Sequence, residues 1–181
     1  LVAGRVAERF ALPTFVTAWE PDGEGTGSAR SIASVDLGRV VRDAVQDGLL
    51  TKGGSHAMAA GFKIDRRKEA DVQAMIAAAE QTFDKLDILC NNAGFGGPMA
   101  PLHKQTLETW DKVHNTNIRG VFLGMKYGII SMLKSGGGAI VNTGSASGVI
   151  GWKHHSVYGS AKAGVHQLAK IAALDYADHN I

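Results

Sequence analysis

The chain has 181 residues, of which 45% are hydrophobic and 20% charged, an ordinary balance for one globular domain with a sizeable core. The net charge is only +2, and no Lys/Arg cluster with interleaved aromatic residues occurs, which argues against nucleic-acid binding. The single cysteine excludes an internal disulfide and fits a reducing cytoplasm, and no apolar run approaches the roughly 18 residues needed to span a bilayer. We therefore expect one cytoplasmic domain that binds neither nucleic acid nor membrane.

Neither end of the sequence resembles a natural terminus. The chain begins with Leu1 rather than methionine and stops at "DYADHNI", within what reads as a helix and its exit. We expect residues 1–181 to form a single but partial domain of a longer protein. The stretch 12–27 is rich in proline, glycine and acidic residues without a clear period, which favours a loop or an insertion. The alternative is a strand at 14–18 followed by a phosphate-binding turn.

From residue 31 onward, short β-branched runs alternate with amphipathic segments. The pattern predicts strands at 31–35, 56–64, 86–90 and 138–145, and helices at 37–49, 68–83, 106–134 and 157–177. The first of these helices is expected to stop at the "KGG" of 52–54. Alternating elements of this length favour right-handed crossovers and a parallel sheet covered on both faces.

Polar or glycine-rich residues follow several of the predicted strands at the point where each strand ends. These are Asp36, Asp65, the "NNAG" of 91–94 and the "NTGS" of 142–145. Ligands of parallel α/β sheets bind outside the carboxyl ends of the strands. We therefore expect the functional site at this edge of the sheet.

Tyr158 and Lys162 are four residues apart and lie on one face of the last predicted helix. The residues between them, Gly159, Ser160 and Ala161, are small and would let a flat ligand approach closely. A lysine ammonium near a phenol stabilises the phenolate, which prepares Tyr158 to give or take a proton near neutral pH. The alternative is a packed aromatic ring beside a solvated lysine.

Two further polar residues could complete a proton-transfer site. Ser145 stands 13 residues before Tyr158 at the end of a predicted strand, where its hydroxyl can bind a substrate oxygen or merely cap a turn. Asn117 is expected to point inward from the preceding helix, and an inward amide is costly to bury unless it binds something. Its partner is either a water linked to Lys162 or a buried structural hydrogen bond.

Four segments resemble, in order and spacing, the motifs of the short-chain dehydrogenase/reductase family: "NNAG" (91–94), "NIRG" (117–120), "NTGSASG" (142–148) and "YGSAK" (158–162). The resemblance covers about residues 31–181. It implies an α/β fold with a Rossmann-type doubly wound parallel sheet and helices on both faces, truncated at both ends. It also implies an NAD(P)-dependent oxidoreductase.

The resemblance assigns a catalytic tetrad. Tyr158 would be the general acid/base, and Ser145 would orient the substrate oxygen. Lys162 would hold the ribose hydroxyls of the cofactor and favour the phenolate, and Asn117 would order a water of a proton relay.

The resemblance also assigns cofactor contacts. Asp36 would bind the adenosine ribose 2′-OH and repel a 2′-phosphate, which favours NAD over NADP. Asp65 would lie near the adenine. Arg66 stands where the family usually has a small apolar residue. It is either a surface residue or a residue that weakens the preference for NAD. The complete set of expected cofactor residues is Asp36, Asp65, Asn91, Ala93, Gly94, Tyr158 and Lys162.

The family's glycine-rich T-G-x-x-x-G-x-G turn is absent in recognisable form, and Gly4 is the candidate for its last glycine. In that case the first strand would lie upstream of Leu1, and its loss would leave unpaired strand edges and exposed apolar surface. The mobile substrate lid would follow Ile181. No metal site is expected, because the side chains of the adjacent His154 and His155 diverge and no carboxylate lies near them in sequence.

Two functions remain open. The first is an enzyme that transfers hydride between a secondary alcohol or ketone and NAD(H), with Trp152 available to cover a ring-shaped substrate. The second is a non-catalytic nucleotide-binding or assembly subunit. In relatives the helices at 106–134 and 157–177 pack between subunits, so a homo-oligomer, either a dimer or a tetramer, is expected.

Overall fold

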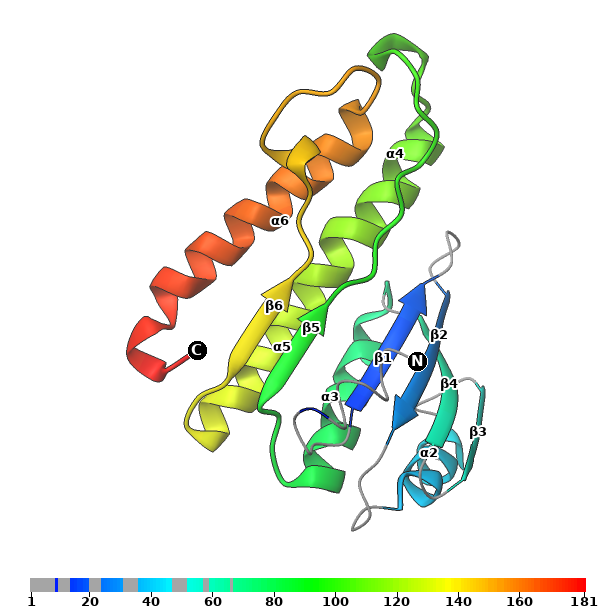
Figure 1. The fold of residues 1–181 in the computed structure, drawn as a ribbon, viewed down its shortest axis with the longest axis vertical. Coiled ribbons are helices and arrows are strands. Elements are labelled where there is room, and N and C mark those ends of the chain that lie inside the picture. Colours follow the sequence, from blue (N-terminus) through cyan, green and yellow to red (C-terminus); the bar gives the residue numbers. More distant parts are fainter. Residues whose placement is uncertain are drawn as a thin grey trace.

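The computed structural model describes residue 9 and residues 14–19, 24–30, 36–46, 52–56, 59–65 and 67–181 (Figure 1). Its first part contains β1 (Thr14–Trp19), β2 (Glu24–Arg30), α2 (Leu37–Gln46), β3 (Lys52–His56), β4 (Ala59–Asp65) and α3 (Glu69–Phe83). Its second part contains β5 (Ile88–Asn91), α4 (Leu107–His114), a π-helical turn (Asn115–Arg119), α5 (Gly120–Ser135), β6 (Ala139–Asn142) and α6 (Ser156–Asp175). Short 3-10 turns lie at Leu102–Lys104, Ala146–Gly148 and Ala177–His179.

Strands β5 and β6 form a parallel pair, in register from Ile88 opposite Ala139 to Asn91 opposite Asn142. Two parallel strands need a crossover connection, which α4, the π-helical turn and α5 supply. In Figure 1 the two strands run side by side with α5 along them. This part of the chain confirms the predicted α/β architecture with parallel strands, and both strand ends that carry the motifs point the same way.

The described helices cover one face of the β5–β6 pair. Leu89 packs with Ile76 of α3 and Met132 of α5, and Ile140 borders the same core. On the opposite face the alternate residues Ile88 and Val141 are 49% and 56% exposed. Among the described residues β5 has β6 as its only paired strand, so both an edge and an apolar face are uncovered there.

The first four strands form a separate sheet in the order β1-β2-β4-β3, and each neighbouring pair is antiparallel. The prediction of parallel strands is therefore wrong for this segment. The loop predicted over 12–27 is wrong where β1 and β2 pair, from Thr14 opposite Arg30 to Trp19 opposite Gly25, and the alternative strand at 14–18 is confirmed as β1. β2 is bonded on both sides, and such pairing overrides a weak local strand signal.

Further boundaries differ from the prediction, and the strand predicted at 138–145 is shorter, since β6 covers only Ala139–Asn142. The "KGG" expected to stop a helix begins β3, and the strand expected at 56–64 is divided between the end of β3 and β4. The predicted strand at 31–35, Gly4 and Arg66 lie outside the described residues. The helices near 37–49, 68–83 and 157–177 are confirmed as α2, α3 and α6.

The helix predicted over 106–134 is interrupted by the wide turn Asn115–Arg119. Such π-helical turns project an extra residue and occur often at functional sites. Here the turn buries Thr116 and Asn117 completely or nearly so, at 1% and 0% exposure. The apolar core below it joins Val121, Met125 and Ile129 of α5 with Val165 of α6.

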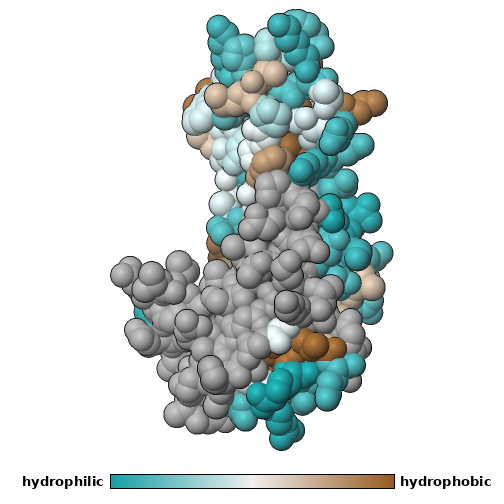
Figure 2. Space-filling model, turned by 90° about the vertical axis from the view of Figure 1, so that its right-hand side faces the viewer, coloured by the Kyte–Doolittle hydropathy of each residue, from teal (hydrophilic) through white to brown (hydrophobic). Residues whose placement is uncertain are grey.

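The surface near α4 carries several exposed apolar side chains. Figure 2 shows brown apolar groups among hydrophilic ones over the upper part of one face. The exposed residues of the segment from β5 to α4 include Met99, Leu102, Leu107 and Trp110. Within the described ranges, none of the helices combines the length and apolarity that a membrane crossing would need.

Candidate active site

Lys162 of α6 is buried, with 2% of its surface exposed, and its ammonium is held by the backbone after β6. Its Nζ donates a 2.6 Å hydrogen bond to the carbonyl oxygen of Thr143. The same Nζ lies 5.8 Å from the centre of the Tyr158 ring, one helical turn away. The structure therefore rejects a solvated lysine and places a buried positive charge beside a phenol.

Tyr158 is half-buried in the first turn of α6. Its ring packs on the cluster of Val113, Val157 and Ala161, which joins α4 to α6. The ring of His155 meets it edge-on at 6.1 Å between centres. These contacts orient the phenol while leaving part of it accessible.

Ser145 lies three residues beyond the end of β6, where it caps the 3-10 turn Ala146–Gly148. Its Oγ accepts a 3.3 Å hydrogen bond from the Ser147 backbone and lies 3.1 Å from the Ser147 hydroxyl. Its backbone N–H donates to Nε2 of His166 on α6 at 3.3 Å. The capping role is therefore present, and it presents the serine next to the helix that carries Tyr158.

Asn117 makes a buried structural hydrogen-bond set. Its Nδ2 donates to the carbonyl oxygens of Phe95 and Val113 at 2.7 and 2.9 Å, and its Oδ1 accepts from the Phe95 N–H at 3.1 Å. The amide thus ties the loop after β5 to the π-helical turn. A Cβ added at Gly94 would stand 2.8 Å from Asn117 Oδ1 and 3.3 Å from Lys162 Nζ, so these two side chains lie against the same glycine.

The "NNAG" segment locks the carboxyl ends of β5 and β6 together. Asn91 Nδ2 donates to Asn142 Oδ1 at 2.9 Å, and the Asn91 carbonyl accepts from the Thr143 N–H at 3.0 Å. Asn92 accepts from the Thr143 hydroxyl at 2.8 Å, and Ala93 is buried. The structure thus brings Asn91, Ala93 and Gly94 to the end of the strand pair that also holds Lys162.

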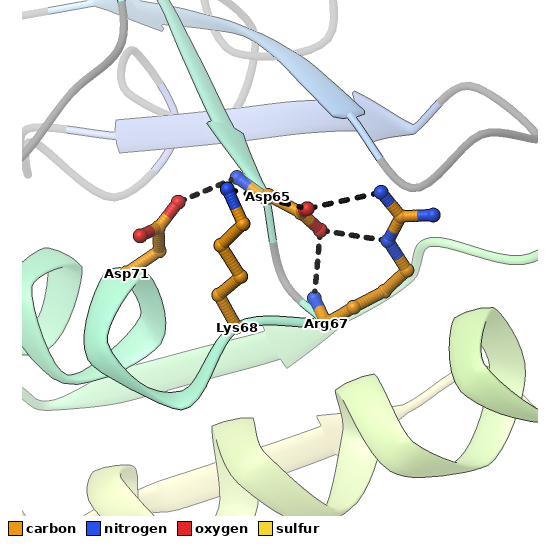
Figure 3. A network of polar contacts seen from close by, with 4 residues as sticks. All are labelled: Asp65, Arg67, Lys68 and Asp71. Carbon is orange, nitrogen blue, oxygen red and sulfur yellow. Dashed lines mark hydrogen bonds and ion pairs between the residues drawn. The ribbon is translucent and has the colours of Figure 1, made fainter.

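Asp65 lies at the end of β4, apart from this cluster, and its carboxylate is engaged by its own neighbours (Figure 3). Arg67 binds it through Nε at 2.9 Å, through a terminal nitrogen at 3.0 Å and through its backbone N–H at 3.0 Å. Burial by itself raises the pKa of Asp65, but the Arg67 hydrogen bonds and charge outweigh it and hold the pKa below its ordinary value. The carboxylate serves as a structural ion pair in this structure.

Asp36 is exposed at the start of α2, where its carboxylate accepts a 3.0 Å hydrogen bond from the Arg39 N–H. This is the geometry of a helix N-cap. Helix α2 packs on β3, β4 and α3, and Figure 1 shows it well away from β5 and β6. The structure therefore does not bring Asp36 or Asp65 to the other predicted site residues.

These residues suit the nicotinamide end of a nicotinamide dinucleotide better than its adenosine end. At the end of β5 and β6, the glycine backbone at Gly94 allows close approach to the buried Lys162 and half-buried Tyr158. At the adenosine end, both oxygens of Asp65 are bound to Arg67. The described residues therefore fit the nicotinamide-ribose half of the cofactor and supply no assembled adenine site. Among the same residues, no three His, Cys, Asp or Glu side chains group as metal ligands.

The sequence pattern did not single out Thr143 or His166, although both bear on the site. His166 follows Lys162 by four residues, as Lys162 follows Tyr158, so all three share one face of α6. This four-residue spacing is the sequence signal that could have identified His166. The segment before α6 is held against the rest of the fold, because His155 is half-buried, contacts Met99 Sδ through Nε2 at 2.9 Å and meets the Trp152 ring edge-on.

A family model described as short chain dehydrogenase matches residues 25–181 of the chain. Among curated relatives, cyclohexanol dehydrogenase of Acinetobacter sp. strain SE19 is 37% identical over 151 residues, covering 83% of this chain and 59% of that protein. Cis-4-hydroxycyclohexanecarboxylate dehydrogenase of Sinomonas cyclohexanicum is 34% identical over 181 residues, covering 97% of this chain and 72% of that protein.

Among solved structures, that of an NAD+-bound xylitol dehydrogenase is similar with a TM-score of 0.64 and 34% sequence identity. The match covers 65% of this chain and 45% of the xylitol dehydrogenase. The matches thus span between 45% and 72% of the length of these three proteins.

Proposed function

Because the chain belongs to the short chain dehydrogenase family, we propose that it is an oxidoreductase that moves a hydride between a secondary alcohol or ketone and a nicotinamide dinucleotide. The observation that carries the proposal is the buried Lys162, whose Nζ joins the turn before Ser145 and lies 5.8 Å from the Tyr158 ring centre. Burying a charge in this position costs free energy. The charge is useful here because it stabilises the phenolate of Tyr158.

In the proposed reaction the alcohol loses a hydride from carbon and a proton from oxygen. When bound, the nicotinamide ring supplies the two-electron acceptor for that hydride. The Tyr158 oxygen takes the hydroxyl proton, and the Lys162 ammonium stabilises the phenolate from which the cycle starts. Ser145 holds the substrate oxygen by a hydrogen bond from its Oγ, and Asn117 keeps the loop after β5 closed around the site. A proton-relay water beside Asn117 belongs to the same proposal.

We infer that NAD is the preferred cofactor. Support comes from the carboxylate of Asp36, which would repel a 2′-phosphate, and from the NAD+-bound state of the xylitol dehydrogenase structure that the chain resembles. The proposed contacts are those of Asn91, Ala93, Gly94, Tyr158 and Lys162 at the nicotinamide end and of the exposed Asp36 at the adenosine ribose; Asp65, whose two carboxylate oxygens bind Arg67, is not among them. A turnover with NADP equal to that with NAD would contradict this preference.

The substrate class we propose is a secondary alcohol on a six-membered carbocycle. Two relatives are named for cyclohexanol and for cis-4-hydroxycyclohexanecarboxylate, both ring alcohols. The aromatic series of Trp152, His155 and Tyr158, with edge-on contacts at 5.4 and 6.1 Å, would give the carbocycle an aromatic wall beside the acid/base.

We also propose a homo-oligomer, either a dimer or a tetramer. A groove between α6 and the π-helical turn, with the adjoining ends of α4 and α5, has a largely apolar lining, and Phe122 and Ile171 in that lining are 48% and 46% exposed. Surfaces of this kind mark interaction sites. Light scattering of the purified protein tests this: we expect a mass at least twice 19.1 kDa, and a monomer after Phe122→Glu.

Oxidation of cyclohexanol with NAD by the protein and by Tyr158→Phe tests the function. We expect turnover to fall at least about 100-fold in the variant, because the proton acceptor is lost, while NADH affinity measured by fluorescence stays within about twofold. Tyr176→Phe, a half-buried tyrosine just after α6, is the matched control and should retain activity. NADH binding without turnover of any secondary alcohol would instead favour a nucleotide-binding or assembly subunit.

A further inference from the structure

Two side chains on one face of α6 form hydrogen bonds with the backbone of the turn that follows β6. Lys162 Nζ donates to the carbonyl of Thr143 at 2.6 Å, and His166 Nε2 accepts from the N–H of Ser145 at 3.3 Å. Gly144 lies between Thr143 and Ser145 and has no side chain, and a Cβ there would overlap the His166 ring. The imidazole therefore lies directly against the turn.

We propose that His166 is a positioning residue that sets Ser145 for the reaction, an inference that rests on the proposed function. Ser145 is held on its other side, since its Oγ binds the N–H and lies beside the hydroxyl of Ser147. The hydrogen bond that the Ser145 N–H donates to His166 fixes the backbone from which this hydroxyl projects. Because His166, Lys162 and Tyr158 share one rigid helix, the bond also fixes Ser145 relative to the acid/base.

The hydrogen bond dictates the form of the imidazole. A backbone N–H can only donate, so Nε2 of His166 must be an acceptor and carry no hydrogen. The neutral ring must then hold its hydrogen on Nδ1. This tautomer is a property of the proposed contact that a merely space-filling histidine does not require.

NMR of the full chain with isotope-labelled histidine reads this tautomer directly, and the signals absent from His166→Gln identify the residue. We expect the neutral ring of His166 to carry its hydrogen on Nδ1 and none on Nε2. A hydrogen on Nε2 would overturn the proposal. This measurement needs no turnover, so it decides the contact even if the proposed oxidoreductase activity fails.

Kinetics with cyclohexanol and NAD test the consequence for Ser145. His166→Leu removes the acceptor and should lower kcat about tenfold, the value of roughly one hydrogen bond, with KM for NAD within about twofold. His166→Gln, whose amide oxygen can accept the same bond, should recover at least half of the wild-type kcat. Lys170→Leu, an exposed position one turn further along α6, is the control and should match wild type.

The outcomes separate the two hypotheses. A wild-type protein that turns over no secondary alcohol contradicts the proposed function. An active wild-type protein whose kcat is unchanged by His166→Leu contradicts the positioning role, and so does a His166→Gln variant as impaired as His166→Leu.

Discussion

Nζ of Lys162 lies 2.6 Å from the carbonyl oxygen of Thr143, which makes a buried ammonium the bridge between α6 and the end of β6. The residue is 2% exposed, so its charge depends on acceptors that the fold supplies. The bridge joins the two segments that carry the proposed acid/base and the proposed substrate-orienting serine. Substitutions at Lys162, at the residues around it and at the distant Asp65–Arg67 ion pair should affect activity and stability differently.

Replacement of Lys162 by methionine separates catalysis from stability. We expect turnover to fall at least about 100-fold, because no cation remains to stabilise the phenolate. The free energy of unfolding should change by less than about 1.5 kcal/mol, since the lost charged hydrogen bond is offset by the desolvation no longer required. Urea denaturation and initial rates measure the two effects, and Lys170→Met is the exposed control. A variant with nearly full activity would refute the role of the ammonium.

Replacement of Asn117 by leucine tests its structural hydrogen bonds through their effect on stability. It leaves the part-buried N–H and carbonyl of Phe95 and the buried carbonyl of Val113 without the amide that binds them. We expect the free energy of unfolding to fall by about 2–4 kcal/mol. Asn115→Leu, in the same π-helical turn but half-buried, should cost clearly less. Equal losses for both variants, measured by urea denaturation, would show that the Asn117 bonds carry little energy.

The contact between the 3-10 turn and α6 leaves no room at Gly148. A Cβ there would stand 2.7 Å from the carbonyl carbon of Lys162 and 2.8 Å from the backbone nitrogen of Ala163, neither of which can rotate away. We expect Gly148→Ala to destabilise the protein by about 1–3 kcal/mol and to lower turnover, because the turn and Ser145 must move off α6. Gly151→Ala, with nothing within 4 Å of the added Cβ, should stay within about 0.5 kcal/mol of wild type. Thermal denaturation of the pair checks the expected ranking.

The Asp65–Arg67 ion pair predicts a pH dependence of stability. The pKa of Asp65 in the folded state lies below its ordinary value of 3.8, so as the pH falls the unfolded chain takes up the proton first. The stabilisation is therefore complete above the unfolded-state pKa and is lost as the pH falls through the lower, folded-state pKa. Arg67→Gln should lower the free energy of unfolding at pH 6, with a difference from wild type that shrinks towards pH 3.

The surface pair of Lys85 and Asp87 provides the control for that titration. Its side chains are 56% and 45% exposed at a separation of 2.7 Å, so water and salt screen the interaction. Lys85→Gln should change the unfolding free energy little at either pH. An Arg67→Gln effect that is the same at pH 6 and pH 3 would contradict the assignment of the lowered pKa to Arg67.

Local sequence patterns were sufficient to predict many of the helices and strands in the second half of the chain. The four-residue spacing of Tyr158 and Lys162 requires only helical geometry, and α6 has it. The strands before "NNAG" and "NTGS" were predicted because β-branched and apolar runs ended by turn residues are a local signal. The same four motifs led to the family that the comparisons establish.

Only the tertiary structure decided which groups meet. The amide of Asn117 bonds Phe95, 22 residues away, and Ser145 bonds His166, 21 residues away, and no period in the sequence reports such contacts. The antiparallel pairing of β1 and β2 replaced a predicted loop, because strand pairing depends on partners across the sheet. Asp65 ended a strand as predicted, yet its carboxylate is bound by Arg67. Helix and strand periods are set by neighbours along the chain, whereas hydrogen bonds and ion pairs are set by neighbours in space.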